Sequence, residues 1–291
     1  MESLRNKVVI ITGSSSGIGA ACAVTFARHG ARVVVCGRDQ RRLDKVCADC
    51  RDSSATASAS SARRRSGDDD DGEDRVFAVR GDLADEESCR RIVDGAVERF
   101  GGVDVLVLCA GYGITRGTEE TTVADLRELW HVHVVAGCFL MTRLARPHLR
   151  RSGGNVVVIS SLLALHPMPL NLAYAVTKAA QEQYVRLTAA ELAADGVRVN
   201  AVRPGWVRTA IIERNAGVVG GRLASEVIFG LFDRRTPAGR CGTAAEIAEY
   251  TAYVAADGAC GRVNGQCLTI DGGEALPYVL SPDGGGGCTL L

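Results

Sequence analysis

Apolar residues along the chain alternate between short β-branched runs and longer stretches with the 3.6-residue spacing of an amphipathic helix. Helices are expected near residues 17–29, 40–50, 85–100, 122–149, 171–195 and 243–256. The runs that predict strands are Val8–Thr12, Val33–Cys36, Val76–Val79, Val103–Cys109, Val156–Ser160, Val197–Val202 and Cys267–Ile270. They are apolar throughout, as expected for a parallel sheet that is buried on both faces. The alternation predicts a single α/β, doubly wound domain, with a seven-stranded parallel sheet flanked by helices on both faces.

Two segments fall outside this pattern. Residues 52–74 contain no Val, Ile, Leu, Met or aromatic residue, and they end in an arginine triplet followed by an aspartate run. Such a composition buries too little apolar surface to offset the entropy lost on ordering, so we expect a disordered insertion there. A docking or phosphorylation element near Ser66 is the functional alternative. Residues 276–291 are expected to form a flexible glycine-rich tail, which leaves residues 1–275 as the domain.

Charge and cysteine content exclude several classes of protein. Thirty-four basic residues balance 34 acidic ones, so the chain lacks the bulk positive charge of a nucleic-acid-binding protein. No apolar run approaches the roughly 20 residues of a membrane-spanning helix, and no secretory signal is expected. The 11 cysteines are scattered, and the Cys47–Cys50 pair has no second pair for zinc. We therefore expect free cysteines, no metal site and a cytoplasmic protein.

The first strand leads into a glycine-rich turn, Thr12-Gly13-Ser14-Ser15-Ser16-Gly17-Ile18-Gly19, and then into a helix. Glycines at such a turn let the backbone approach a pyrophosphate, whose charge meets free N–H groups and the positive end of the helix dipole. The position of the turn, in the first βαβ unit, favours a dinucleotide site over a merely flexible turn. This predicts a Rossmann-type domain whose loop contacts to the cofactor are Gly13, Ser15, Ser16, Gly17, Ile18 and Gly19.

The end of the second strand selects between NAD(H) and NADP(H). NAD sites place a carboxylate there to accept from the ribose 2′-hydroxyl, but this chain has Gly37 followed by Arg38. A guanidinium binds a 2′-phosphate well, so NADP(H) is favoured. Asp39 would act as an NAD-type acceptor in a register shifted by one residue, so NAD(H) stays open.

After the third strand, Asp82 is expected at the adenine amino group, with Leu83 beside it. The alternative is that Asp82 complements the dipole of the helix that follows.

Ser161, Tyr174 and Lys178 form the candidate catalytic set. Tyr174 and Lys178 are four residues apart on one helix and share a face, and Ser161 follows a strand at the carboxyl edge of the sheet. A phenol is a poor base near neutral pH, but an adjacent ammonium favours the phenolate. Tyr174 would then exchange a proton with the substrate while hydride moves at the same carbon. Ser161 would hydrogen-bond the substrate oxygen, and Lys178 would also hold the nicotinamide ribose.

Together these motifs resemble the short-chain dehydrogenase/reductase family. The resemblance rests on Thr12-Gly13-xxx-Gly17-x-Gly19, the Ser161-to-Tyr174 spacing, Tyr174-xxx-Lys178, Asn200-xxx-Pro204-Gly205 and Asp271-Gly272-Gly273, in order along the chain. It implies NAD(P) binding by the glycine loop and hydride transfer between alcohols and carbonyls. It also implies homodimers or homotetramers formed through the helices at 122–149 and 171–195. The residues that it places beside the nicotinamide are Pro204, Gly205, Val207 and Thr209.

Two positions depart from the family pattern. Family members carry Asn-Asn-Ala-Gly after the fourth strand, where this chain has Leu108-Cys109-Ala110-Gly111. Ala110 and Gly111 keep the backbone that flanks the cofactor, and we expect altered stability rather than lost binding. His133 replaces an Asn that, in the family, holds a water linking the catalytic Lys to solvent in a proton relay. His133 would preserve that relay through its carbonyl or imidazole, plug it, or merely pack between helices, and the sequence leaves these alternatives open.

The loops at 112–117, 162–172 and 206–240 are expected to line the substrate site. Their apolar residues favour an apolar secondary alcohol or carbonyl over a sugar, although packing of a lid helix or a subunit contact is an alternative. These residues are Leu162, Leu163, Leu165, Met168, Leu170, Trp206, Ile211, Ile212, Val218, Val219, Leu223, Val227, Ile228, Phe229, Leu231 and Phe232. The sequence thus predicts an NADP(H)-preferring oxidoreductase. The alternatives are a 3-oxoacyl-thioester reductase and a weakly catalytic, cofactor-binding regulatory protein.

The last four residues, Cys288 to Leu291, match a permissive prenylation pattern. No polybasic run or second acylation site supports a lipid anchor, and an unstructured tail is the alternative.

Overall fold

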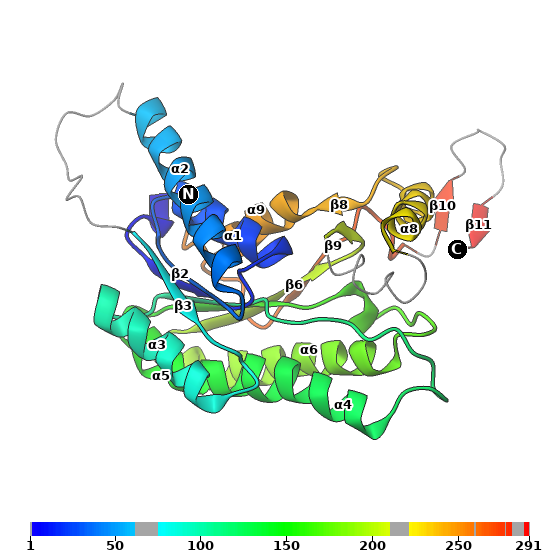
Figure 1. Ribbon diagram of the computed structural model, residues 1–291, viewed down its shortest axis with the longest axis horizontal. Helices are drawn as coiled ribbons and strands as arrows, with labels where there is room; N and C mark the ends of the chain where they lie inside the picture. The colour runs from blue at the N-terminus through cyan, green and yellow to red at the C-terminus, as the bar shows by residue number, and fades with distance from the viewer. Residues whose placement is uncertain are drawn as a thin grey trace.

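A parallel sheet forms the centre of the computed structural model, and helices cover both of its faces (Figure 1). The structure describes residues 2–61, 75–209, 221–258, 260–276, 278–280 and 288–290. The spatial order of the strands is β3-β2-β1-β4-β5-β6-β9, and every pair is parallel. The strands are β1 (Val8–Ile11), β2 (Arg32–Gly37), β3 (Val76–Arg80), β4 (Val105–Leu108), β5 (Asn155–Ile159), β6 (Arg198–Pro204) and β9 (Cys267–Ile270). The seven-stranded, doubly wound α/β fold predicted from the sequence is therefore confirmed.

Each strand contributes to two apolar cores, because successive side chains point to opposite faces of the sheet. Val9 and Ile11 of β1 lie in one core, whereas Val8 and Ile10 lie in the other. The first core is closed by α1 (Gly17–Arg28), α2 (Gln40–Ser61) and α9 (Ala244–Ala255). The second is closed by α3 (Glu86–Phe100), α5 (Met141–Ser152) and α6 (Leu172–Leu192), with α4 (Val123–Trp130) on the same side (Figure 1).

The strand order reverses direction at β1, whose neighbours are β2 on one side and β4 on the other. The helices that follow β1 and β4 therefore leave toward opposite faces, and a crevice opens between them at the carboxyl ends of these strands. This topology alone places the glycine turn after β1 next to the segment after β4.

The helix expected over residues 122–149 is unbroken, but its hydrogen-bond register changes in the middle. It consists of α4, a π-helical segment η2 (His131–Leu140) and α5, which contains Pro147. The β-branched run Val132, Val134 and Val135 weakens the α-helical preference here, and an added Cβ on Gly137 would meet the Val132 carbonyl oxygen at 2.5 Å.

The predicted disordered insertion at 52–74 is wrong in its first part, because α2 continues through Ser61. The Ser54 hydroxyl lies 3.0 Å from the Cys50 carbonyl oxygen and 3.1 Å from that of Ala27, which ties this turn of α2 to α1. The alanines of the segment also favour helix without needing a core of their own. Residues 62–74, with Ser66, lie outside the described part of the chain.

The predicted flexible tail also contains regular structure. Strand β10 (Tyr278–Leu280) pairs antiparallel with β11 (Cys288–Leu290), so backbone hydrogen bonds order both ends of this segment. Cys288 lies in β11, and its prenylation stays a prediction. None of the helices within the described residues is long and apolar enough to span a membrane.

Candidate active site

A cleft of about 1220 Å³ lies at the carboxyl edge of the sheet. All predicted cofactor residues line it, together with Ser161, Tyr174 and Lys178. His133 does not. The predicted residues on its wall are Gly13, Ser15, Ser16, Gly17, Ile18, Gly19, Arg38, Asp82, Leu83, Ala110, Gly111, Ser161, Tyr174, Lys178, Pro204, Gly205, Val207 and Thr209. Segments that are far apart in the sequence thus meet in one cleft.

The glycines of the turn leave little room for side chains at their own positions. Gly13 has a φ of +67°, and an added Cβ would lie 2.7 Å from the Ala110 Cα. Gly17 has a φ of +58° and begins α1, so the unpaired N–H groups of the first turn face the cleft. A Cβ on Gly19 would lie 2.5 Å from the Gly13 carbonyl oxygen. Closely approached backbone and a helix N-terminus are what a pyrophosphate requires, so the residues present fit a dinucleotide.

Thr12 joins the glycine turn to the segment after β4. Its buried hydroxyl accepts hydrogen bonds from the backbone N–H groups of Cys109 (3.0 Å) and Ala110 (3.1 Å). Leu108 is packed in one apolar core, and Cys109 packs against the other. Burial raises the pKa of the Cys109 thiol to about 12, so the side chain stays neutral. The lost Asn pair is therefore replaced by apolar packing, and the Thr12 bridge still holds the two segments together.

The end of the cleft beside β2, where the ribose is expected, carries two arginines. An added Cβ on Gly37 would lie 3.0 Å from the Ser15 side chain, so a larger residue there would have to displace that side chain. Arg38 is 70% exposed at its side chain, and its NH1 lies 3.7 Å from an Asp82 carboxylate oxygen. Asp39 accepts from the Arg42 backbone N–H (3.2 Å) and pairs with the Arg42 side chain (3.3 Å). Its carboxylate thus serves the start of α2, although the residue borders the cleft. Arg42 also lines the cleft, and the sequence reasoning missed it.

Asp82 does not act as the N-terminal acid of α3. That helix begins at Glu86, and Asp85 is its N-cap, accepting from the backbone N–H groups of Glu87 and Ser88. Asp82 instead accepts from the Ala84 backbone N–H (3.0 Å) in the turn before the helix, and it borders the cleft with Leu83.

The chain turns sharply after β6, beside the part of the cleft where the nicotinamide is expected. Gly205 donates to the Ile270 carbonyl oxygen (3.0 Å), and an added Cβ would lie 2.8 Å from the Asp271 Cβ. This close approach of two backbones explains why glycine follows Pro204. Thr209 faces Gly17 across the cleft, 3.7 Å from the point that a Cβ on Gly17 would occupy.

Ser161, Tyr174 and Lys178 come together where β5 ends and α6 begins. The Ser161 hydroxyl oxygen accepts from the Leu163 backbone N–H (3.2 Å) at the start of a short 3-10 turn, η3 (Leu162–Ala164). Because a hydroxyl has one donor and two acceptor sites, Ser161 keeps its donor for the cleft. The Lys178 ammonium is buried, lies 5.5 Å from the centre of the Tyr174 ring, and donates to the Ile159 carbonyl oxygen (2.8 Å). A hydroxyl donor, a phenol and an ammonium thus border the same space.

His133 is fully buried behind this set, and its ring meets the Tyr174 ring edge-on, with the ring centres 5.7 Å apart. Its Nε2 accepts from the Tyr112 backbone N–H (3.3 Å), so we assign the ring proton to Nδ1, which donates to the Thr177 hydroxyl (2.8 Å). Thr177 in turn donates to the Tyr174 carbonyl oxygen (2.8 Å). Burial, followed by the nearby Lys178 charge, lowers the pKa of His133 well below 6.5.

Both the side chain and the backbone carbonyl of His133 contact other segments of the site. The imidazole joins the loop after β4 to α6, and an added Cβ on Gly111 would lie 2.9 Å from its Nε2. The His133 carbonyl oxygen accepts from the side chain of Gln181 (2.9 Å), a residue that the sequence reasoning missed. Gln181 lies three residues after Lys178, and this spacing on the same helix face was the available signal.

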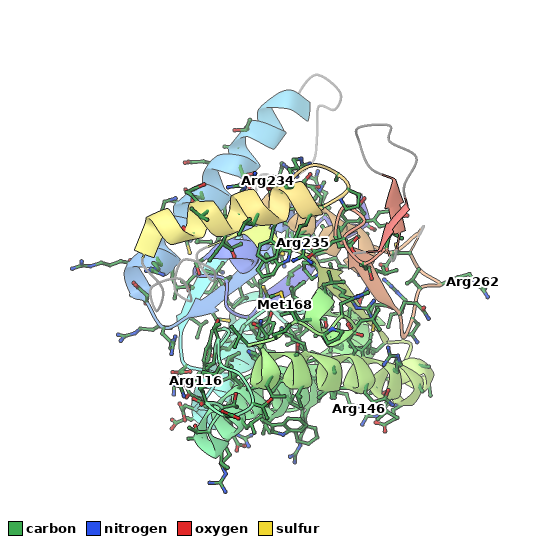
Figure 2. All side chains as sticks on the ribbon, turned by 90° about the vertical axis from the view of Figure 1, so that its right-hand side faces the viewer. Arg116, Arg146, Met168, Arg234, Arg235 and Arg262 are labelled. Atoms are coloured by element: carbon green, nitrogen blue, oxygen red, sulfur yellow. The ribbon has the colours of Figure 1, made fainter. Side chains whose placement is uncertain are left out.

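The substrate end of the cleft is apolar with polar groups at intervals. Trp206, which follows β6, stacks on Phe232 of α8 (Gly221–Arg235), with the ring centres 3.6 Å apart. Polar residues of the three predicted loops also line the cleft, and these are Tyr112, Thr115, His166, Asn171 and Arg235. Glu274 lies outside those loops, and the sequence reasoning missed it. Arg235 and Met168 lie in the region between α8 and the helices below it (Figure 2). Burial raises the pKa of Glu274.

The apolar wall is smaller than predicted. Leu165, Val227 and Leu231 are 60%, 62% and 53% exposed and do not line the cleft. Residues 211, 212, 218 and 219 and the side chain of Leu223 lie outside the described part of the structure. The apolar side chains that do line this end are Leu162, Leu163, Met168, Leu170, Trp206, Ile228, Phe232 and Leu276. Within the described residues, no three His, Cys, Asp or Glu side chains are grouped to hold a metal ion.

Known proteins resemble this chain over nearly its whole length. A family model described as enoyl-(acyl carrier protein) reductase matches residues 13–274. An uncharacterized oxidoreductase of Methylorubrum extorquens is 34% identical, over 94% of this chain and 99% of its own. The L-fucose dehydrogenase of Mus musculus is 32% identical, over 94% of this chain and 89% of its own.

Solved structures also resemble this chain over nearly its whole length. A short-chain dehydrogenase/reductase of Caenorhabditis elegans superposes with a TM-score of 0.82 at 31% identity, covering 97% of this chain and 98% of its own. L-Sorbose reductase of Gluconobacter frateurii gives a TM-score of 0.80 at 27% identity, with 94% and 98% covered. Sequence, fold and the residues around the cleft lead to the same conclusion: the chain belongs to the short-chain dehydrogenase/reductase family of oxidoreductases.

Proposed function

We propose that this protein is an NADP(H)-preferring oxidoreductase that interconverts an apolar secondary alcohol and its carbonyl. The observation that carries the proposal is the convergence of Ser161, Tyr174 and Lys178 on one cleft with the glycine turn. In that cleft Tyr174 is the general acid and base, Ser161 donates to the substrate oxygen, and Lys178 favours the phenolate and binds the ribose.

The preference for NADP(H) is supported by charge at the ribose end. Gly37 stands where an NAD site carries an acid, and Asp39 is engaged at the start of α2. Arg38 and Arg42 are the cations that line this end. Two guanidinium groups near one ribose favour a phosphate over a hydroxyl. Asp82 would bind the adenine amino group from the same wall.

Proton transfer follows from the arrangement of the three side chains. When bound, the nicotinamide supplies the acceptor or donor of two electrons and one hydrogen. During alcohol oxidation Tyr174 takes the hydroxyl proton, and during carbonyl reduction it returns one. The Ser161 hydroxyl stabilises the negative charge that develops on the substrate oxygen. The Lys178 ammonium, 5.5 Å from the centre of the Tyr174 ring, supports the charge on the Tyr174 oxygen.

An apolar substrate is supported by the stacked Trp206–Phe232 pair and the leucines around it. A second candidate is a hydroxylated substrate, because Asn171, Arg235 and Glu274 also line this end. Two similar proteins favour the second candidate by their names: one is an L-fucose dehydrogenase, and the other is an L-sorbose reductase solved with NADPH and L-sorbose.

The decisive experiment combines a cofactor titration with a substrate panel. NADPH and NADH are titrated by cofactor fluorescence, and apolar ketones, sugars and 3-oxoacyl thioesters are then assayed with the preferred cofactor. We expect tighter binding of NADPH and the highest kcat/KM on apolar ketones. With Tyr174→Phe, kcat/KM should fall by about a thousandfold, while NADPH still binds. Full activity of Tyr174→Phe, or tight NADPH binding by the unaltered protein without turnover of any substrate, would contradict the proposal.

A homo-oligomer is the expected assembly. Trp130, Val135 and Phe139 are exposed on α4 and η2, and Val176 and Leu187 are exposed on the adjacent α6. Large apolar side chains on neighbouring helices are typical of a subunit contact. Light scattering after size exclusion tests this, and a monomer would contradict it. A cytoplasmic location stays a prediction, which the absence of disulfides among the described cysteines supports.

A further inference from the structure

Gln181 is a buried amide between the catalytic lysine and the π-helical segment. It is 2% exposed, and its Oε1 accepts from the Lys178 Nζ (3.0 Å). Its Nε2 donates to the His133 carbonyl oxygen (2.9 Å) and to the Cys138 Sγ (3.5 Å). The two N–H groups and the oxygen of the amide therefore all have partners. A polar side chain in this position must be satisfied in this way, because burying an unpaired amide is strongly unfavourable.

This contact determines where the Lys178 ammonium points. An ammonium has three N–H donors, and the Ile159 carbonyl oxygen and the Gln181 Oε1 take two of them. The third is left for the cleft, which Lys178 borders. With only the Ile159 contact, the end of this flexible side chain would be free to rotate. Gln181 thus fixes the direction of the donor that faces the ribose and the Tyr174 ring.

The same amide also closes a route for protons. It fills the space between the Lys178 Nζ and the His133 carbonyl oxygen, so neither atom is open to a water on that side. An amide neither takes up nor releases a proton near neutral pH. A proton that reaches Lys178 from Tyr174 therefore cannot continue through Gln181 into η2 and must exchange with solvent on the cleft side.

Four titratable groups lie around the Lys178 ammonium. The titratable groups that face it are Tyr174 on its own helix, Cys109 after β4, and His133 and Cys138 on η2. Burial raises the pKa of both thiols to about 12 and lowers that of the imidazole, so these three groups are neutral. The carboxylate of Glu182, next in sequence, is bound to Arg203 (2.6 Å).

We propose that Gln181 is a positioning residue of this active site, which holds Lys178 toward the cleft and confines proton exchange of Tyr174 to the cleft side. The proposal rests on the proposed function, because it assigns Lys178 and Tyr174 the roles given above. It predicts that altering the amide changes the proton chemistry of Tyr174, although Gln181 touches neither the phenol nor the cleft.

The test compares Gln181→Glu and Gln181→Leu with the matched controls Gln183→Glu and Gln183→Leu, whose position is exposed on the same helix. A carboxylate at 181 opposes the Lys178 ammonium and makes the phenolate less favoured. The pH profile of kcat/KM should therefore move to higher pH by about one unit for Gln181→Glu, in both reaction directions. Gln181→Leu should lose about tenfold in kcat/KM and bind NADPH more weakly, since Lys178 is no longer held. Both controls should match the unaltered protein.

A second readout does not need turnover. Absorbance titration of the NADP⁺ complex, with the curve of Tyr174→Phe subtracted, follows the phenol of Tyr174 alone. Its midpoint should rise in Gln181→Glu and stay in Gln183→Glu. An unchanged midpoint and pH profile in folded Gln181→Glu would overturn the positioning role, as would an unaltered NADPH affinity and kcat/KM in folded Gln181→Leu. If no protein turns over any substrate, the proposed function fails, while the titration still decides the role of Gln181.

Discussion

The two ends of the cleft are built differently. At the cofactor end, Gly13 and Gly19 bring backbone against backbone, because an added Cβ on either would lie less than 3 Å from another backbone atom. At the substrate end, side chains from loops and from α8 form the wall, and several are partly exposed. Backbone packing tolerates almost no change, whereas a wall of side chains can be repacked. The cofactor end should therefore be rigid and the substrate end adaptable.

Gly13→Ala tests the rigidity of the cofactor end most directly. The change places a Cβ 2.7 Å from the Ala110 Cα on a residue with φ of +67°, so the turn must deform. We expect NADPH affinity to fall by about a hundredfold or more, which is about 2.7 kcal/mol. Gly230→Ala is the control, because nothing lies within 4 Å of its added Cβ, and its helix should gain up to about 1 kcal/mol. Fluorescence titration and thermal unfolding measure both; normal NADPH binding by Gly13→Ala would refute the rigid turn.

Arg38→Ala tests the cofactor end at its exposed rim. The guanidinium is 70% exposed, so a bond from it to a 2′-phosphate would be partly screened by solvent. We expect about a tenfold loss of NADPH affinity and no change for NADH. Arg41→Ala, an exposed neighbour outside the cleft, should bind both cofactors normally. Equal losses of affinity for NADPH and NADH would instead mean that Arg38 contacts a part of the cofactor that both molecules share.

Trp206→Ala probes the adaptable end. Removing one ring of the stacked pair takes apolar surface from the substrate wall. The KM for an apolar ketone should rise several-fold to about tenfold, with a smaller change in kcat and unchanged NADPH binding. Tyr250 is an exposed aromatic residue of α9 outside the cleft, and Tyr250→Ala should leave the KM unaltered. A loss of NADPH binding in Trp206→Ala would show that the two ends are not separate.

The last prediction concerns stability and His133, which joins the loop after β4 to α6. His133 has a pKa well below 6.5 in the folded protein, so only the unfolded chain takes up a proton as the pH falls below about 6.5. This residue therefore makes stability fall with decreasing pH, by at most about 1.4 kcal/mol per pH unit. His133→Asn should flatten that acid limb of the unfolding free energy, measured by urea unfolding at several pH values. His131→Asn, at an exposed position on the same segment, is the control. An acid limb equally steep in His133→Asn would mean that His133 takes no part in it.

The cofactor end is predictable from local sequence patterns. A glycine turn between a strand and a helix specifies backbone conformation directly, and the Tyr174–Lys178 spacing places two side chains on one helix face. The strand positions are predictable for a similar reason, since buried parallel strands are apolar throughout. The substrate end is less predictable because it is built from side chains, and exposed and buried leucines look alike in sequence. Leu165, Val227 and Leu231 were assigned to the wall for that reason and face outward instead.

Contacts between distant parts of the chain decided three features that the sequence did not predict. The helical continuation of α2 through Ser61 depends on its contact with α1, and the hairpin at the chain's end depends on two strands finding each other. The π-helical register of η2 arises where a β-branched run meets Gly137. A helix propensity summed along the chain contains none of these contacts.

By itself, then, the sequence determined the doubly wound fold, the glycine turn and the Ser161, Tyr174 and Lys178 set, because each is specified by neighbours one helical turn or one strand away. Only the tertiary structure decided the contacts of His133, whose imidazole joins the loop after β4 to α6 while its carbonyl oxygen accepts from Gln181. The reason is physical: the state of a buried polar group depends on which partners burial brings to it, and those partners come from elsewhere in the chain.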